Sequence, residues 1–412
     1  MNDKFYSWIM FLISPFVSMI LAFKDYTATY SRNIFWAFCT FYGLTFAIGG
    51  ESDGSDILFY INEMKSLYLR HELTVYQAIE LFKNSGEVDV FKSIISFMLS
   101  RFTDNQAVLT MVYAFIFGFF FSRNIWYVFS IIDGKLNGLT KLLLLALILV
   151  VPIWNINGVR MYLAFHVFMY GLLPFIFENR KHKLVFCFAS FLIHFSFLIP
   201  ISVLLVFLLV GTRLNIYFII FVASIFVSEF EITQFNQIID TYVPDALAQR
   251  SAGYRNEQVV EEYKEGIINV TSNWYSLWYH KGLRWSLTLI LIYLFSFSKY
   301  RIKTSYNWKK ILSFCLLFFA ISNFLSNVPS GSRFYIFAFF LTLTLIILYL
   351  NKFQEDSKFL LMIQVLSPAI LLFIVISFRL GLYNTSLSTI LANPIIALFS
   401  AGETIPINDL IK

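Results

Sequence analysis

The chain has 412 residues, of which 58% are hydrophobic and only 14% are charged, and its net charge is +6. This composition excludes an ordinary soluble protein, in which about a quarter of the residues are charged. The three cysteines lie apart within hydrophobic runs, so the sequence predicts neither a disulfide framework nor a cysteine metal site.

About twelve hydrophobic runs approach the roughly 20 apolar residues that a membrane-spanning helix needs. The first run has no basic leader or small-residue cleavage site, so we expect it to be a retained helix. The stretch 184–211 has Pro200 in its middle and could be one long kinked helix or two short ones. We interpret it as two spans, because the alternation of basic loops farther along the chain then stays consistent. The sequence thus predicts an all-α, polytopic membrane helix bundle that forms one domain over residues 1–412. The predicted spans lie near residues 5–23, 33–50, 106–123, 141–155, 160–177, 184–198, 199–211, 214–230, 282–297, 311–325, 334–350 and 359–378.

Charged residues are divided unevenly between the loops on the two sides of this bundle. Six alternate loops hold 16 of the 31 lysines and arginines but only 5 of the 25 acidic residues. By the positive-inside rule these loops are cytoplasmic, and both chain ends face outward. The basic loops are expected to meet anionic lipid headgroups, and the net charge is not a sign of nucleic-acid binding. The six loops are residues 24–32, 122–141, 178–183, 211–213, 298–310 and 351–358.

Two of the outward segments are longer than ordinary connections. The segment 51–105 contains helically spaced apolar residues, such as Ile61, Met64 and Tyr68, with polar residues between them. It is expected to form amphipathic helices that lie at the outer interface or are re-entrant. The segment 231–281 carries mixed charges and ends in Trp and Tyr residues, which favour the membrane interface. Long loops of this kind are usually functional or disordered.

Two arginines begin predicted spans at their outer ends. Arg160 follows Asn157 and Gly158, and Arg333 follows a small polar turn that ends in Ser332. An isolated arginine at such a place is about as often a membrane anchor as a functional group. A guanidinium is also a rigid fork of donors that fits phosphate oxygens and stays charged. Two arginines at matching depth favour the second interpretation, a diphosphate-binding site.

Two further ionisable residues are candidates for acid–base chemistry on the same side. His194 lies within the predicted span 184–198, where a histidine is a candidate site, although one bonded to a neighbouring helix is equally common. Asp56 belongs to an acidic cluster that, alone, is best interpreted as a solvated loop. Near two arginines, Asp56 is instead suited to accept a proton from a sugar hydroxyl. The spacing of Asp53 and Asp56 is weak support for a divalent ion, and no metal site is predicted.

Four ordered motifs carry these residues: Gly54-x-Asp56-x-x-x-Tyr60, Asn157-x-x-Arg160-x-x-Leu163-Ala164, Phe191-Leu192-Ile193-His194-Phe195-Ser196 and Ser332-Arg333-Phe334-Tyr335. The set resembles the EpsG-like, Wzy-type polysaccharide repeat-unit polymerases in order and spacing over most of residues 1–350. The chain departs from that family at Met161, where glutamine is usual. It also has Gly49-Gly50-Glu51 where the family often has an arginine before the first motif.

The resemblance implies a glycosyltransferase of the bacterial cytoplasmic membrane, similar in architecture to the GT-C-like enzymes that use lipid-linked sugars. Such an enzyme moves a growing glycan from undecaprenyl diphosphate to the non-reducing end of a new lipid-linked repeat unit at the outer face. It would need no nucleotide, cofactor or obligatory metal, because arginines stabilise the charge of the leaving diphosphate. The expected partners are undecaprenyl-diphosphate-linked oligosaccharides, membrane lipid, a flippase and a chain-length regulator.

The resemblance also implies roles for single residues. Arg160 and Arg333 would bind and activate the two diphosphates. Asp56, or His194 in its place, would orient or deprotonate the acceptor hydroxyl. The remaining candidates would bind substrate. Two are tyrosines that would stack on sugars or position the arginines, and one is the asparagine of the arginine motif. The others are basic residues of the segment 231–281, which would be a lid over the sugar chains. These candidates are Tyr60, Tyr335, Asn157, Arg250, Arg255 and Lys281.

Two other functions are left open by the sequence. An exporter of lipid-linked oligosaccharide would also have about twelve spans and a polar membrane site, and interrupted helices near the membrane centre would favour it. A ligase that joins finished polymer to another acceptor would share chemistry and topology with a polymerase. The gathering of ionisable residues toward the outer face favours a transferase, because an exporter must offer its site to both sides.

Overall fold

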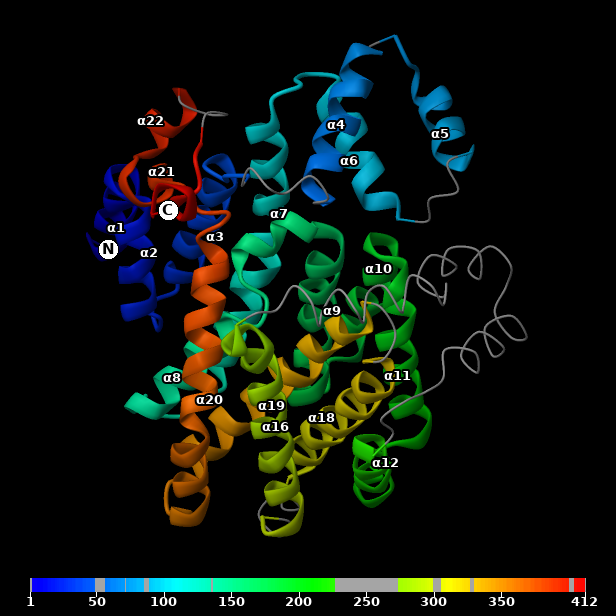
Figure 1. Cartoon of the computed structure of the whole chain (residues 1–412), viewed down its shortest axis with the longest axis vertical. Coiled ribbons are helices and arrows are strands. Elements are labelled where there is room, and N and C mark those ends of the chain that lie inside the picture. Colours follow the sequence, from blue (N-terminus) through cyan, green and yellow to red (C-terminus); the bar gives the residue numbers. More distant parts are fainter. Residues whose placement is uncertain are drawn as a thin grey trace. The chain divides into compact units, whose positions relative to one another are not determined.

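The computed structural model describes residues 2–48, 56–70, 72–84, 89–134, 136–226, 273–298, 305–326, 330–399 and 404–411. The regular structure among these residues is helical (Figure 1), apart from two isolated bridges that join Phe46 to Thr385 and Ser386 to Pro406. The all-α class predicted from the sequence is therefore confirmed for the described part of the chain. The chain divides into two compact units.

The first unit contains Met1–Asp133, Val151–Ile201 and Ser377–Lys412. Most of the helices that carry the sequence motifs belong to it. Its helices are α1 (Asn2–Ile13), α2 (Pro15–Lys24), α3 (Ser31–Leu44), α4 (Asp56–Leu69), α5 (Val75–Asn84), α6 (Val90–Ser100), α7 (Gln106–Ser130), η1 (Ile153–Gly158), α9 (Val159–Glu178), η2 (Lys181–Lys183), α10 (Leu184–Ile193), η3 (Phe195–Phe197), α21 (Leu387–Leu391), α22 (Pro394–Phe399) and α23 (Ile407–Ile411).

The second unit contains Gly134–Val150 and Ser202–Ile376. Two helices, α11 and α20, begin in one unit and end in the other. The helices that lie wholly or largely in the second unit are α8 (Gly138–Ile148), α11 (Leu198–Val210), α12 (Leu214–Phe226), α16 (Trp274–Ser296), α18 (Tyr306–Leu325), η4 (Gly331–Phe334), α19 (Tyr335–Lys352) and α20 (Ser357–Gly381).

Five helical runs among the described residues are long and apolar enough to cross a membrane. Other apolar helices, such as α11 and α12, are shorter than a spanning helix needs to be. The described residues thus have the character of a helical membrane protein, and the twelve spans stay a prediction. The five runs are Gln106–Ser130, Gly138–Glu178, Asn307–Leu325, Gly331–Lys352 and Ser357–Gly381.

The first predicted span is two helices rather than one. The helix α1 ends before Ser14, and α2 begins at Pro15. Proline lacks an N–H and has a fixed φ, so it begins a helix readily and interrupts the one before it. The two helices pack against each other, and Ser18 Oγ donates to the carbonyl oxygen of Ser7 over 3.3 Å. The expectation of a single helix over 5–23 is therefore wrong.

The helices α3 and α7 approach each other closely because glycines lie in their contact. A Cβ on Gly43 of α3 would come within 2.4 Å of Ala114 Cβ on α7. A Cβ on Gly118 of α7 would come equally close to Cys39 Cβ on α3. Small residues at a crossing let two backbones approach, which is how helices associate in lipid. Since α7 also contacts α9, this contact supports the helix that carries Arg160.

Helices α4 and α6 of the segment 51–105 lie side by side (Figure 1). A buried ion pair fastens them, because Lys92 Nζ of α6 lies 3.2 Å from Glu63 Oε2 of α4 and the Lys92 side chain is only 1% exposed. The ammonium also lies 4.7 Å from the centre of the Phe59 ring. A buried charge needs such partners, since its desolvation is expensive. The helix α6 in turn contacts α10, which leads into His194.

The apolar stretch 184–211 is interrupted, but not at Pro200, where the sequence predicts the break. The helix α10 ends at Ile193, and His194 is extended, with φ −150° and ψ 120°. Pro200 lies in the first turn of α11, where a missing N–H leaves no intrahelical bond unmade. The division at Pro200 is therefore wrong, and the interruption lies at His194.

The helix α19 forms the core of the second unit. Its apolar window is buried entirely, and it contacts α8, α16 and α18. The Phe337 ring stacks on Phe318 of α18, with ring centres 5.0 Å apart. A helix that is hydrophobic all round is one that other helices surround. Its first turn follows η4, which contains Arg333.

Candidate functional site

The buried carboxylate of Asp89 joins two of the predicted site residues. Its Oδ2 accepts from Arg160 Nη1 over 2.9 Å and lies 3.2 Å from His194 Nδ1. Its Oδ1 accepts from the backbone N–H of Phe195 over 2.9 Å. The side chain is only 1% exposed. Three elements far apart in the sequence, the starts of α6 and α9 and the end of α10, therefore meet at this carboxylate.

Asp89 is the N-cap residue of α6, yet its side chain makes no capping hydrogen bond. Burial alone would raise the pKa of this carboxyl. The hydrogen bond and charge of His194, the Phe195 N–H and the charge of Arg160 outweigh burial, so the pKa of Asp89 lies below its usual value of 3.8. The carboxylate is therefore ionised at neutral pH and holds its partners by charge-assisted hydrogen bonds.

The Arg160 guanidinium is held on two sides and free on the others. Its Nε donates to Tyr60 Oη over 2.7 Å, and Nη1 donates to Asp89. The side chain is 26% exposed. Among the described residues, two of the five N–H donors of the arginine are thus used, and three are left for an anion.

The phenol of Tyr60 supports Arg160 from α4. Its ring is buried, and the Arg160 guanidinium lies 5.4 Å from the ring centre. Burial raises the pKa of this phenol, although the charge of Arg160 opposes the shift, so Tyr60 stays neutral. Of the two expected roles, stacking on a sugar or positioning the arginine, the buried ring fits the second.

Asp56 is the first residue of α4 and lies at the edge of this group. It is exposed, and its Oδ2 lies 4.0 Å from where a Cβ on Gly158 would stand. Asp56 interacts electrostatically with Tyr60 and Arg160, but it makes no hydrogen bond with His194. Asp56, which the sequence predicts as the base, thus lies beside Arg160 and is not bonded to His194.

The His194 imidazole is oriented by the break in the helix. The side chain is 16% exposed, and its backbone N–H donates to the carbonyl oxygen of Ser190 over 3.1 Å. When Nδ1 carries the proton toward Asp89, Nε2 presents its lone pair, and Nε2 has no partner in the described part of the chain. A carboxylate that fixes the tautomer of a histidine leaves the opposite nitrogen ready to act as a base.

The Asn157 amide lies in η1, three residues before Arg160. Its Oδ1 is buried and has no hydrogen-bond partner among the described residues. Buried polar atoms without a partner are rare in folded proteins and call for an explanation. A bound polar group beside η1 would satisfy this amide.

His166 lies farther along α9 and is held within the protein, away from the group around Asp89. Its ring is buried, with Nε2 3.1 Å from the carbonyl oxygen of Val151 and Nδ1 3.3 Å from Asn124 Nδ2. No group of three or more His, Cys, Asp or Glu side chains among the described residues is arranged to hold a metal ion.

The remaining predicted residues lie in the second unit or outside the described residues. The Arg333 side chain is exposed and makes no hydrogen bond or ion pair with the described residues. Tyr335 is buried, and its hydroxyl donates to Asn323 Oδ1 over 2.7 Å. Lys281 is exposed about two turns into α16, which begins at Trp274. Arg250 and Arg255 lie outside the described residues, as do positions 231–272 of the expected lid.

A second arginine in this unit was not anticipated. The Arg284 guanidinium lies 5.3 Å from the centre of the Tyr335 ring. Asn323, which binds the Tyr335 hydroxyl, donates through Nδ2 to Ser224 Oγ over 2.9 Å. The Tyr335 phenol is thus held from two sides. Its motif neighbour Arg333 is exposed and is bonded to none of the described side chains.

No family model, curated protein or solved structure matches this chain. The resemblance to repeat-unit polymerases is therefore carried by the four motifs alone. The structure brings residues of three of them, Tyr60, Arg160 and His194, to one group in the first unit. Asp89, the residue that joins two of them, belongs to none of the motifs.

Proposed function

We propose that the chain is a glycosyltransferase that uses a lipid-diphosphate-linked oligosaccharide and polymerises repeat units. The observation that carries the proposal is the sharing of one buried carboxylate by a partly free arginine and a histidine. Transfer of a glycan from a diphosphate to a hydroxyl needs a cation at the leaving group and a base at the acceptor. Asp89 contacts one group of each kind, with Arg160 as the cation and His194 as the base.

Arg160 is the group proposed to meet the donor. Its three unused N–H donors are suited to the oxygens of a diphosphate, which a guanidinium binds in a bidentate manner. As the bond from the anomeric carbon to the diphosphate oxygen breaks, negative charge develops on the diphosphate. A guanidinium fixed by Asp89 and Tyr60 stabilises that charge without having to move.

His194 is the group proposed to meet the acceptor. With Nδ1–H held by Asp89, Nε2 takes the proton of the acceptor hydroxyl as its oxygen bonds to the anomeric carbon. The proton ends on His194, and the electron pair of the broken bond ends on the diphosphate. Asp56, beside Gly158, is reassigned from base to a group that tunes the charge near Arg160.

Arg333 is proposed to bind the diphosphate of the second lipid-linked chain. Its exposed side chain makes no ion pair with the described residues, and it follows an αL residue, Ser330, with φ 63°. The resemblance of its motif supports the same role. We infer that the protein lies in a bacterial cytoplasmic membrane with this chemistry on the outer face, as the basic loops indicate.

An exporter of lipid-linked oligosaccharide is the second candidate. One observation favours it: the helical run from α10 to α11 is interrupted at His194, and interrupted helices often bind substrates in transporters. Export, however, does not require a base oriented beside a cation, whereas glycosyl transfer requires both. The two functions predict different locations for the substrate when the site is damaged.

The test uses a strain that lacks the gene and is complemented with wild type, Arg160→Lys or His194→Gln at equal membrane levels. Arg180→Ala and His182→Ala are matched controls, because both side chains are exposed in a basic loop away from Asp89. A polymerase predicts single repeat units on the cell surface with either site variant and long chains with wild type and controls. Normal chain lengths in both site variants would contradict the proposal. Lipid-linked units held on the cytoplasmic side would favour the exporter.

A further inference from the structure

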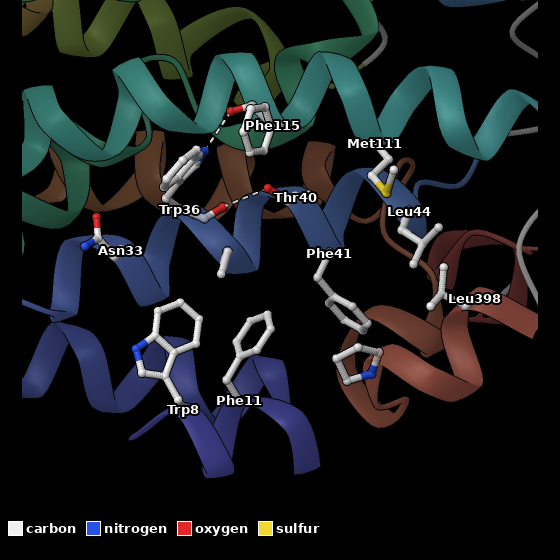
Figure 2. Close-up of a pocket in the computed structure, with 12 residues that line it drawn as sticks. Trp8, Phe11, Asn33, Trp36, Thr40, Phe41, Leu44, Met111, Phe115 and Leu398 are labelled. Atoms are coloured by element: carbon white, nitrogen blue, oxygen red, sulfur yellow. Dashed lines mark hydrogen bonds between the residues drawn. The ribbon is translucent and has the colours of Figure 1, made fainter. Parts of the chain in front are cut away.

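An apolar groove of about 500 Å³ lies between α1, α3, α7 and α22 of the first unit (Figure 2). Its two polar lining residues are bonded within the protein, because Thr40 Oγ1 donates to the Trp36 carbonyl oxygen and Asn33 Oδ1 accepts from Arg123. A groove of this size and character suits a hydrophobic ligand rather than water. The apolar walls include Trp8, Phe11, Phe41, Met111, Phe115 and Leu398.

The groove is open at its rim. Phe115 is 47% exposed and Leu398 is 61% exposed, so large apolar side chains border the opening. Exposed apolar surface around a groove marks a ligand-binding or membrane-facing site. Phe115 belongs to α7, one of the runs that are long enough to cross a membrane. In a bilayer, hydrocarbon would reach the groove through this opening.

The Arg123 guanidinium lies against Asn33 and Trp36, two residues that line one part of the groove. Arg123 Nη2 donates to Asn33 Oδ1 over 2.9 Å, and the guanidinium lies 4.7 Å from the Trp36 ring centre. Its other hydrogen bond, from Nη1 to Ser122 Oγ over 2.8 Å, is also to a neutral group. Arg32 is exposed beside Asn33 and is near enough to act on Arg123 electrostatically.

Neither arginine has a carboxylate partner within the described part of the chain. Arg123 lies within a run apolar enough to span a membrane, where an unpaired cation is costly and usually finds a counter-ion. Its charge is in addition repelled by Arg32. An anion from outside the chain would relieve both. Arg123 uses two of its N–H donors on the described residues, which leaves three for phosphate oxygens.

The length of the groove matches one leaflet. From Asn33 to Leu44, which both line it, α3 rises about 16 Å at 1.5 Å per residue. Half of the hydrocarbon core of a bilayer is about 15 Å. A lipid whose phosphate lies at the arginines would thus have its acyl chain alongside the apolar wall to the middle of the bilayer. Arg32 lies in the segment 24–32, and Arg123 lies in α7 within the predicted loop 122–141. Both are at the side where anionic headgroups are expected.

We propose that this groove binds one acyl chain of an anionic phospholipid, with the lipid phosphate against Arg32 and Arg123. The site is separate from the group around Asp89, and it does not depend on the glycosyltransferase proposal. The lipid would hold α1 and α22 against α3 and α7, since all four helices line the groove.

The test is a titration of the delipidated full-length protein in detergent with phosphatidylglycerol, followed by native mass spectrometry. Arg32→Ala removes an exposed side chain and leaves the fold intact, and Ala37→Phe fills the groove. Lys24→Ala is the control, because it removes an exposed charge from the same basic loop but not from the groove. Arg32→Ala should weaken binding about fivefold, as expected for one basic residue at an anionic lipid. Ala37→Phe should abolish it, and Lys24→Ala should bind as wild type.

Phosphatidylcholine should bind wild type more weakly than phosphatidylglycerol, because its headgroup has no net charge. Equal binding of phosphatidylglycerol to wild type, Arg32→Ala and Ala37→Phe would overturn the proposal. So would a wild-type protein that binds no phosphatidylglycerol but retains a polyprenyl diphosphate, or one in which a second copy of the chain covers the groove.

Discussion

Asp89 and Arg160 form an ion pair of 2.9 Å although 71 residues separate them in the chain. The pair connects the start of α6 with the start of α9, two helices that the sequence places in different parts of the protein. Because the same carboxylate also holds His194, a change at Asp89 affects both proposed functional groups at once. The predictions below separate the roles of this group from those of its surroundings.

The stability of the protein should fall in acid partly through Asp89. The pKa of this carboxyl is lower in the folded protein than its usual 3.8, so its contribution is present above that pH. It is lost as the pH falls through the lower, folded value. Thermal unfolding in detergent from pH 7 to pH 3 should show a smaller decrease in Tm for Asp89→Asn than for wild type. At pH 7 the variant should be less stable by about 3 kcal/mol, because Arg160 loses its buried partner.

Asp104→Asn is the control for this experiment, because Asp104 is an exposed acid of the same unit. Its acid profile should follow that of wild type. If Asp89→Asn and wild type lose Tm in parallel as the pH falls, the carboxylate is not the buried, charge-stabilised group described above.

Tyr60→Phe should reduce activity moderately. The change removes the oxygen that accepts from Arg160 Nε but keeps the ring. A hydrogen bond of this kind contributes about 1 kcal/mol, which corresponds to roughly a fivefold change in kcat/KM. Arg160→Lys should cost far more, because a lysine lacks the fork of donors. Tyr217→Phe, which removes the bond to the Gly211 carbonyl oxygen, should leave kcat/KM unchanged. An equal loss in the two tyrosine variants would remove the case for Tyr60 as a positioning residue.

Arg333→Ala should separate function from stability in the second unit. Its side chain is exposed and makes no ion pair with the described residues. The free energy of unfolding should therefore change by less than about 0.5 kcal/mol, and the Tm should stay close to that of wild type. Chain elongation should nevertheless be lost if Arg333 binds a diphosphate. Lys281→Ala, another exposed cation of that unit, is the matched control for Tm. Normal polymer from Arg333→Ala would reduce the residue to a membrane anchor.

The contact between α3 and α7 should tolerate no added methyl group at Gly118. In Gly118→Ala the new Cβ would stand 2.4 Å from Cys39 Cβ, an overlap that should destabilise the protein by roughly 1–3 kcal/mol. Adding Cys39→Gly should recover part of the lost Tm, because it removes the atom that clashes. Gly138→Ala is the control, since nothing lies within 4 Å of its Cβ position. A Gly118→Ala protein as stable as wild type would show that the helices separate without cost.

The ordered motifs of the sequence anticipated much of the site. Tyr60, Arg160 and His194 lie in one group because their motifs fall at the ends of elements that meet in the fold. Asp89 was missed, since an aspartate before an amphipathic helix is normally interpreted as an N-cap. The signal available was only its position within a segment predicted to face outward, which does not distinguish a cap from a tertiary contact.

Breaks in the helices were harder to predict than the helices themselves. Pro200 is the stronger breaker by residue type, but in the first turn of α11 it costs nothing, and the chain breaks at His194 instead. The reverse holds at Pro15, which divides the first apolar run. Whether a proline interrupts a helix depends on where the helix begins, and local sequence does not determine that position. Tertiary contacts contribute to it, such as the hydrogen bond from the Phe195 N–H to Asp89 beside the break at His194.

The central claim is that His194, oriented by Asp89, takes a proton from an acceptor hydroxyl while Arg160 holds the leaving diphosphate. The most direct measurement is release of polyprenyl diphosphate by the purified protein in proteoliposomes supplied with lipid-linked repeat units from the strain that lacks the gene. Wild type and His182→Ala should release it and form long chains. His194→Gln, with an unchanged Tm, should be slower by about 10²–10⁴-fold. Release by His194→Gln at the wild-type rate would contradict the account.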